Sequence, residues 1–118
     1  GKRVYTLTLY LQDPVDIRVG ALGRIEFCKG YYCYTGSAQG GVGRIFRHLK
    51  RIGQKNDNPR WHIDYLLSRS KVRAVLLVPS DTRLESYVAE RLSGLFEEVH
   101  PGFGASDTRD RTHLFYVG

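Results

Sequence analysis

Tyrosine, arginine and histidine side chains gather in one short part of this sequence. The run Gly30-Tyr31-Tyr32-Cys33-Tyr34-Thr35-Gly36-Ser37-Ala38 is typical of a tyrosine-bearing strand that leads into a glycine-rich turn. A helix is expected after the turn, and it carries Arg44 and His48. A tyrosine hydroxyl can exchange a proton with water, and an arginine can neutralise phosphate charge. These residue types together indicate phosphodiester chemistry.

Arg44 and His48 are four residues apart, so they share one face of the expected helix. The apolar stripe of that helix lies on its other side, centred on Ile45 and Leu49. Arg44 is therefore either a phosphate clamp or an ordinary solvated arginine. Tyr34, directly before the turn, is the tyrosine best placed to reach a ligand, and most of the eight tyrosines are expected to pack as core or rim residues.

The charge is uneven along the chain, which has a net charge of +6. Basic residues dominate one segment: Arg44, Arg47, Lys50, Arg51, Lys55 and Arg60. Acidic residues dominate a later one: Asp81, Glu85, Glu90, Glu97 and Glu98. A basic cluster beside an acidic region predicts a polyanion-binding face with carboxylates that could hold a metal. A solvated helix face explains the basic cluster equally well.

Length and composition predict one globular domain over residues 1–118. Two cysteines, Cys28 and Cys33, are too few for a disulfide framework, and both are expected to be buried reduced thiols. No apolar run approaches the length of a membrane span, and no signal-peptide pattern is seen. A soluble cytoplasmic protein with no membrane partner is expected.

Period-two alternation predicts a strand over residues 4–11 with one apolar face. A short strand is expected at 17–19, and 24–28 and 31–35 are predicted to form a hairpin around Lys29-Gly30. The apolar run 72–78 predicts a buried strand, and 113–117 a final short one.

Helical spacing of apolar residues predicts a helix from Val42 to Gly53. Asn58-Pro59 favours the start of a second helix that turns Trp61, Tyr65 and Leu66 toward the core. A third helix should begin near residues 80–82, with Leu84, Val88, Leu92 and Leu95 as its apolar positions. The fold class is α/β, with a small, mainly antiparallel sheet flanked by helices.

Other features permit weaker interpretations. The glycine loop 36–43 could cradle an anion, although its spacing fits neither a nucleotide-binding loop nor a dinucleotide fingerprint, and a structural turn is the simpler explanation. Glu85 fits a capping box with Thr82. The pairs His62 with Asp64 and Asp107 with His113 lack zinc spacing, so structural roles are favoured. No Ser-His-Asp signature is present.

Several of these segments resemble a known family. Tyr34-Thr35-Gly36-Ser37, followed by Arg44 and His48, is similar to the second half of the GIY-YIG nuclease pattern. The closer resemblance is to a small branch of that superfamily, the DUF123 domain. It is carried by residues 30–38, by Trp61-His62-Ile63-Asp64-Tyr65-Leu66-Leu67 and by Gly102-Phe103-Gly104-Ala105-Ser106-Asp107, with His113-Leu114-Phe115-Tyr116 at the end.

The resemblance implies a GIY-YIG-like fold and a nuclease site with one divalent ion, Mg²⁺ or Mn²⁺. Tyr34 and Tyr5 would be the tyrosines of the two motif halves, although Arg3 replaces the usual glycine before Tyr5. Arg44 would stabilise charge on the phosphoryl group, and His48 could accept a proton. Glu85 would bind the metal. The late asparagine of many such nucleases has no clear equivalent.

The leading hypothesis is therefore a metal-dependent DNA endonuclease, a hydrolase acting in DNA repair on structured or damaged DNA, alone or beside a repair protein. The basic residues of the expected helix and loop would contact the nucleic acid: Arg47, Lys50, Arg51 and Arg60. The alternative is a non-catalytic nucleic-acid-binding module that keeps the nuclease fold. A nucleotide or small-anion binder is a third option.

Overall fold

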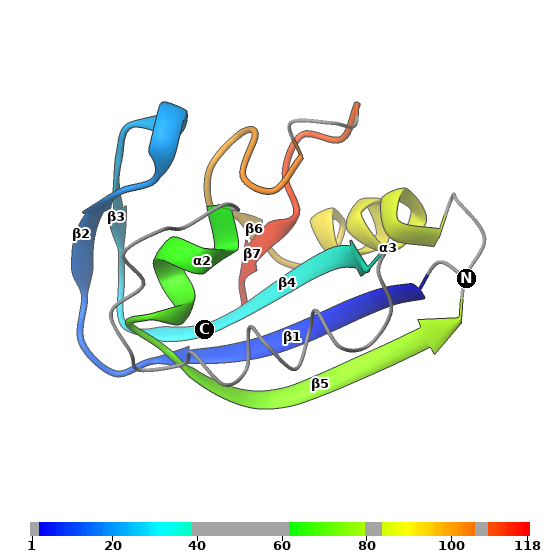
Figure 1. Ribbon diagram of the computed structural model, residues 1–118, viewed down its shortest axis with the longest axis horizontal. Coiled ribbons are helices and arrows are strands. Elements are labelled where there is room, and N and C mark those ends of the chain that lie inside the picture. Colours follow the sequence, from blue (N-terminus) through cyan, green and yellow to red (C-terminus); the bar gives the residue numbers. More distant parts are fainter. Residues whose placement is uncertain (1–2, 39–61, 80–83, 106–108) are drawn as a thin grey trace.

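The first strand of the chain lies inside a five-stranded antiparallel sheet (Figure 1). The computed structural model describes residues 3–38, 62–79, 84–105 and 109–118. Strand β1 (Arg3–Leu11) pairs with β4 (Gly30–Ala38) on one side and with β5 (Lys71–Pro79) on the other. Strands β7 (Leu114–Tyr116) and β6 (Glu97–Glu98) follow, giving the order β5-β1-β4-β7-β6. The predicted α/β class and antiparallel sheet are confirmed.

A separate two-stranded sheet corrects the predicted hairpin. Strand β2 (Val15–Arg18) pairs with β3 (Arg24–Phe27), and the 3₁₀ turn η1 (Gly20–Leu22) joins them. The expected partner of β3 was β4, but β4 has β1 on one edge and β7 on the other. Both edges of β4 are thus occupied, so Lys29-Gly30 connects two sheets instead of turning a hairpin.

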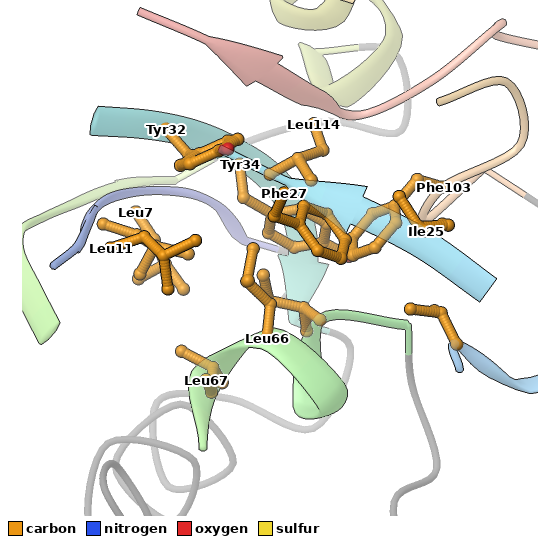
Figure 2. Close-up of a cluster of buried hydrophobic side chains, with 13 residues drawn as sticks. Leu7, Leu11, Ile25, Phe27, Tyr32, Tyr34, Leu66, Leu67, Phe103 and Leu114 are labelled. Atoms are coloured by element: carbon orange, nitrogen blue, oxygen red, sulfur yellow. The ribbon is translucent and has the colours of Figure 1, made fainter. Parts of the chain in front are cut away.

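The described helices are α2 (His62–Leu67) and α3 (Leu84–Ser93). Helix α2 buries Ile63, Leu66 and Leu67 against the sheet, as Figure 2 shows for the two leucines. Helix α3 packs against β4 and buries Ala89. Of its predicted apolar positions, Leu95 lies beyond the end of the helix and is 72 % exposed. Within the described ranges, no helix is long and apolar enough to cross a membrane.

The core lies between the sheet, α2 and the loop that contains Phe103 (Figure 2). Alternate residues of β1 enter it, since Leu7, Leu9 and Leu11 are all buried. The apolar face predicted for this strand is confirmed. Opposite them in the register stand Tyr34, Tyr32 and Gly30 of β4. The expected scaffold role of Tyr32 is confirmed by its burial in this core.

Two burial predictions are wrong. Strand β5 forms as expected, but it is an end strand of the sheet, and Leu76 is 61 % exposed. An end strand has one neighbour instead of two, so its apolar composition does not ensure burial. Cys28 is exposed because it follows β3 in the connection to β4, whereas Cys33 on β4 is buried as expected. Burial raises the pKa of the Cys33 thiol.

Candidate functional site

Tyr5 and Tyr34 come together on one face of the β1–β4 pair. The register sets Tyr5 opposite Gly36 and Leu7 opposite Tyr34, so the two tyrosines are diagonal neighbours. Their ring centroids are 6.2 Å apart and the ring planes are tilted by 44°. The chain thus brings together the two tyrosines that the sequence selected from separate segments.

Gly36 makes this approach possible. A Cβ atom at position 36 would lie 2.7 Å from both Cζ and Oη of Tyr5, and 3.1 Å from Cε2 of Tyr34. Such separations are shorter than van der Waals contact, so a side chain here would displace the Tyr5 ring. Gly36, Ser37 and Ala38 also belong to β4 and pair with β1, so the predicted turn does not begin at Gly36. Their place in the β-ladder argues against an anion cradle at these three residues.

The opposite side of the Tyr34 ring is covered by Phe103 and Gly104. The Phe103 ring meets the Tyr34 ring edge to face at a centroid distance of 6.1 Å. A Cβ at Gly104 would lie 2.8 Å from the Tyr34 hydroxyl oxygen, and Gly104 has a φ of 69°, which favours glycine. The segment is linked to β4 through His113, whose N–H donates to Phe103 and whose carbonyl accepts from Thr35. Tyr34 is consequently held by its neighbours on both sides.

His62, at the start of α2, contacts the same segment. Its Nδ1 accepts a 2.8 Å hydrogen bond from the Gly104 N–H, and its ring lies 5.6 Å from that of Phe103. An accepting Nδ1 carries no proton, so the imidazole is neutral with its proton on Nε2. Burial lowers the pKa of His62 below 6.5, a nearby His100 lowers it further, and a backbone hydrogen bond with Gly102 opposes both. Sequence reasoning had grouped His62 with Asp64 in a structural role and had missed its link to Tyr34.

The two tyrosines differ in access to solvent. Tyr34 is 5 % exposed and belongs to the hydrophobic core, whereas Tyr5 is half-buried at its margin. A substrate would therefore meet Tyr5 more readily than Tyr34. The position of the Tyr34 hydroxyl is fixed by packing, which suits a group that orients another and does not move itself.

Glu85 lies in the first turn of α3, the helix that packs against β4, and it is half-buried. Its predicted capping partner Thr82 is outside the described residues. In the part of the chain that the structure describes, no cluster of three or more His, Cys, Asp or Glu side chains could hold a metal. A Mg²⁺ ion often keeps several waters and takes only one or two carboxylates together with substrate phosphates. A single glutamate at this helix fits that kind of site.

Several predicted site residues lie in the segment 39–61, which is outside the described residues. They are Arg44, Arg47, His48, Lys50, Arg51 and Arg60. Their assignment remains a prediction from the sequence.

Beside Glu85, a hydrogen-bonded chain connects α3 to the residues before β7. Ser86 Oγ donates to Asp110 Oδ2 over 2.7 Å, and His113 Nε2 lies 2.8 Å from the same oxygen. The aspartate stands between serine and histidine, so His113 is not placed to activate the serine as in a hydrolase triad. His113 had been paired with Asp107 from the sequence, but its described partner is Asp110. Among the residues that the structure describes, none forms a hydrogen bond with the buried Nδ1 of His113.

The fold defines a small α/β domain in which an antiparallel sheet brings two tyrosines into contact, and the helix that carries Glu85 packs against one of their strands, β4. Residues 4–118 match the model of the family described as domain of unknown function DUF123. The chain therefore belongs to the DUF123 family. Neither the curated proteins nor the solved structures yielded a significant match to it.

Proposed function

We propose that this protein is a metal-dependent endonuclease of the GIY-YIG type that hydrolyses DNA phosphodiester bonds in the cytoplasm, in the service of DNA repair. The observation that carries the proposal is the contact between Tyr5 and Tyr34 across Gly36, with ring centroids 6.2 Å apart. A nuclease of this type requires one tyrosine from each motif half in a single site. The two free cysteines agree with a reducing compartment.

Each residue has a defined task in this proposal. Tyr5, the more accessible tyrosine, orients the attacking water, and the buried Tyr34 hydroxyl supports it from behind. Arg44 neutralises charge that develops on the phosphoryl group, and His48 accepts a proton. Glu85 would hold the Mg²⁺ or Mn²⁺ ion. The bound ion would polarise a phosphate oxygen and stabilise the leaving group.

The basic segment 44–60 supplies the nucleic-acid contacts of the proposal. Lysine and arginine that neutralise phosphates release counterions, so binding should weaken steeply with salt. Branched or damaged duplexes are the preferred substrates, because a domain of this size has little surface with which to read a base sequence.

The test compares cleavage of single-stranded, duplex and branched DNA in Mg²⁺, in Mn²⁺ and in chelator. The informative variants are Glu85→Gln and Tyr5→Phe, with Glu90→Gln and Tyr31→Phe as matched controls. Glu90 lies on the same helix and is exposed, and Tyr31 is 41 % exposed on β4. Unfolding midpoints of all four variants separate loss of chemistry from loss of fold.

Cleavage that needs the metal, survives both controls and falls at least about a hundredfold in Glu85→Gln and Tyr5→Phe supports the nuclease. DNA binding without cleavage in every metal condition, retained by Glu85→Gln, would instead identify a non-catalytic nucleic-acid-binding module. Absence of both binding and cleavage would contradict both functions.

A further inference from the structure

Three segments that are distant in the sequence meet at Gly104. Tyr34 comes from β4, His62 from the start of α2, and Gly104 from the loop between β6 and β7. Gly104 gives its N–H to His62 Nδ1 at 2.8 Å. Its Cα lies against the Tyr34 ring so closely that an added Cβ would be 2.8 Å from Cε1 and Oη. Gly104 therefore lies against both the histidine and the tyrosine.

The loop at Gly104 depends on external bonds for its position. Ala105 N–H donates to Gly102 C=O over 3.1 Å, which closes a tight turn, and both Gly102 and Gly104 have positive φ. The turn needs a positive φ at its third residue, Gly104, which favours glycine. A turn rich in glycine has many alternative conformations in the absence of tertiary contacts. The Phe103 ring anchors one side of it in the core. The hydrogen bond to His62 fixes the other side, at the glycine that lies against the Tyr34 ring.

We propose that His62 is a positioning residue for Tyr34. By accepting a hydrogen bond from the Gly104 N–H, it holds the Phe103–Gly104 segment against the tyrosine ring and fixes the position of the hydroxyl. The chemical purpose of this positioning rests on the proposed function, in which Tyr34 supports the attacking water. The contact from His62 through Gly104 to Tyr34 does not depend on that function.

The hydrogen bond requires an unprotonated Nδ1, so it breaks when His62 gains a second proton. Two further groups act on this imidazole: a backbone hydrogen bond with Gly102 raises its pKa, and the neighbouring His100 lowers it. Burial lowers the pKa of His62, which keeps the bond intact to lower pH than an exposed histidine would allow. The hydrogen bond from the Gly104 N–H to His62 Nδ1 is accordingly intact at neutral pH.

NMR of the intact chain tests the proposal directly. A scalar coupling between the Gly104 amide nitrogen and His62 Nδ1 is expected near neutral pH and should vanish as the imidazole is protonated. Two variants form a matched pair. In His62→Asn the amide oxygen takes the place of Nδ1, whereas in His62→Gln the oxygen reaches only toward the position of Nε2.

His62→Asn is expected to keep the protection of the Gly104 amide from exchange, and the ¹³Cζ shift of Tyr34, at both neutral and acid pH. His62→Gln should lose about tenfold in that protection and shift the Tyr34 signal, because the amide loses its acceptor. A wild-type chain without the coupling, or a Tyr34 signal that is identical in both variants, would overturn the positioning role. These readouts do not involve DNA, so they stand whether or not the protein cleaves it. Should a variant fail to fold, the coupling and its pH dependence in the wild-type chain decide the matter.

Discussion

Ser86 and Asp110 join the helix that carries Glu85 to the segment before β7 through a 2.7 Å hydrogen bond. The acceptor oxygen is shared with Nε2 of the fully buried His113, at 2.8 Å. One carboxylate thus holds two elements that a substrate site between α3 and β4 would need in a fixed relation.

Replacing Asp110 with alanine should lower the free energy of unfolding by about 2 kcal/mol, because it leaves the buried His113 Nε2 without a partner. Urea unfolding measures the change. The matched control is Asp16→Ala, which removes the exposed ion pair to Arg24 and should cost about 0.5 kcal/mol or less. Equal losses in the two variants would show that the Ser86–Asp110–His113 chain adds nothing to stability.

Tyr32→Phe should destabilise the fold by about 1 kcal/mol. The Tyr32 hydroxyl donates a 2.5 Å hydrogen bond to the Cys28 carbonyl, and the residue is 1 % exposed. Burial raises the pKa of Tyr32 above its ordinary value, so the hydroxyl keeps its proton to higher pH than an exposed tyrosine does. Tyr31→Phe, at the neighbouring exposed position, is the control and should leave the urea midpoint unchanged. A change of the same size in both variants would contradict the assignment.

Gly36→Ala should displace the Tyr5 ring, since the new Cβ would lie 2.7 Å from its Cζ and Oη. The displaced atoms are at the end of a flexible side chain, so the fold should lose only about 1 kcal/mol. The near-ultraviolet circular dichroism of the tyrosines and the Tyr5 ¹³Cζ signal should change clearly. In the control Gly94→Ala, the new Cβ meets only the Arg91 carbonyl at 3.5 Å, and both signals should persist. Unchanged tyrosine signals in Gly36→Ala would mean that Gly36 does not determine the placement of Tyr5.

Acid should destabilise the wild-type chain through His62. Because burial lowers the pKa of this imidazole in the folded state below 6.5, the unfolded chain binds the proton first as the pH falls. The free energy of unfolding is therefore unaffected well above 6.5, decreases below it, and stops decreasing once the folded-state pKa is passed. His62→Asn should remove this part of the pH dependence. Urea unfolding measures the free energy of unfolding of both chains across mildly acid pH. The same pH dependence in the wild-type chain and in His62→Asn would refute the prediction.

The sequence predicted which segments form strands better than it predicted which strands pair with one another. Alternation over residues 4–11 identified β1 and its buried face, because side-chain direction in a strand has a period of two. The Lys29-Gly30 hairpin was wrong because a local turn signal says nothing of the distant strands β1 and β7 that compete for β4. The exposure of β5 was missed for a related reason. Burial of a strand depends on its place in the sheet order, and no local pattern gives that place.

The candidate site divides in the same way. Tyr5 and Tyr34 were selected by a resemblance, and the register of β1 and β4 does place them in contact. The link from His62 to Gly104 escaped notice, because a side-chain to backbone bond between distant loops leaves no spacing in the sequence. The sequence did contain one signal, the two glycines that flank Phe103. Both have a positive φ in the structure, a conformation that favours glycine.

The order of the sheet also determines when this chain can fold. Strand β1 precedes both of its partners in the sequence: one of them is β5, and the other, β4, waits for β7 at residues 114–116. Pairings between residues so far apart close large loops before they gain any stabilising contact, so folding should be slow for a domain of this size. During synthesis the β1–β4 pair must persist with its outer edges uncovered. Tyr5 and Tyr34 can therefore meet before the Phe103–Gly104 segment that fixes Tyr34 has been made.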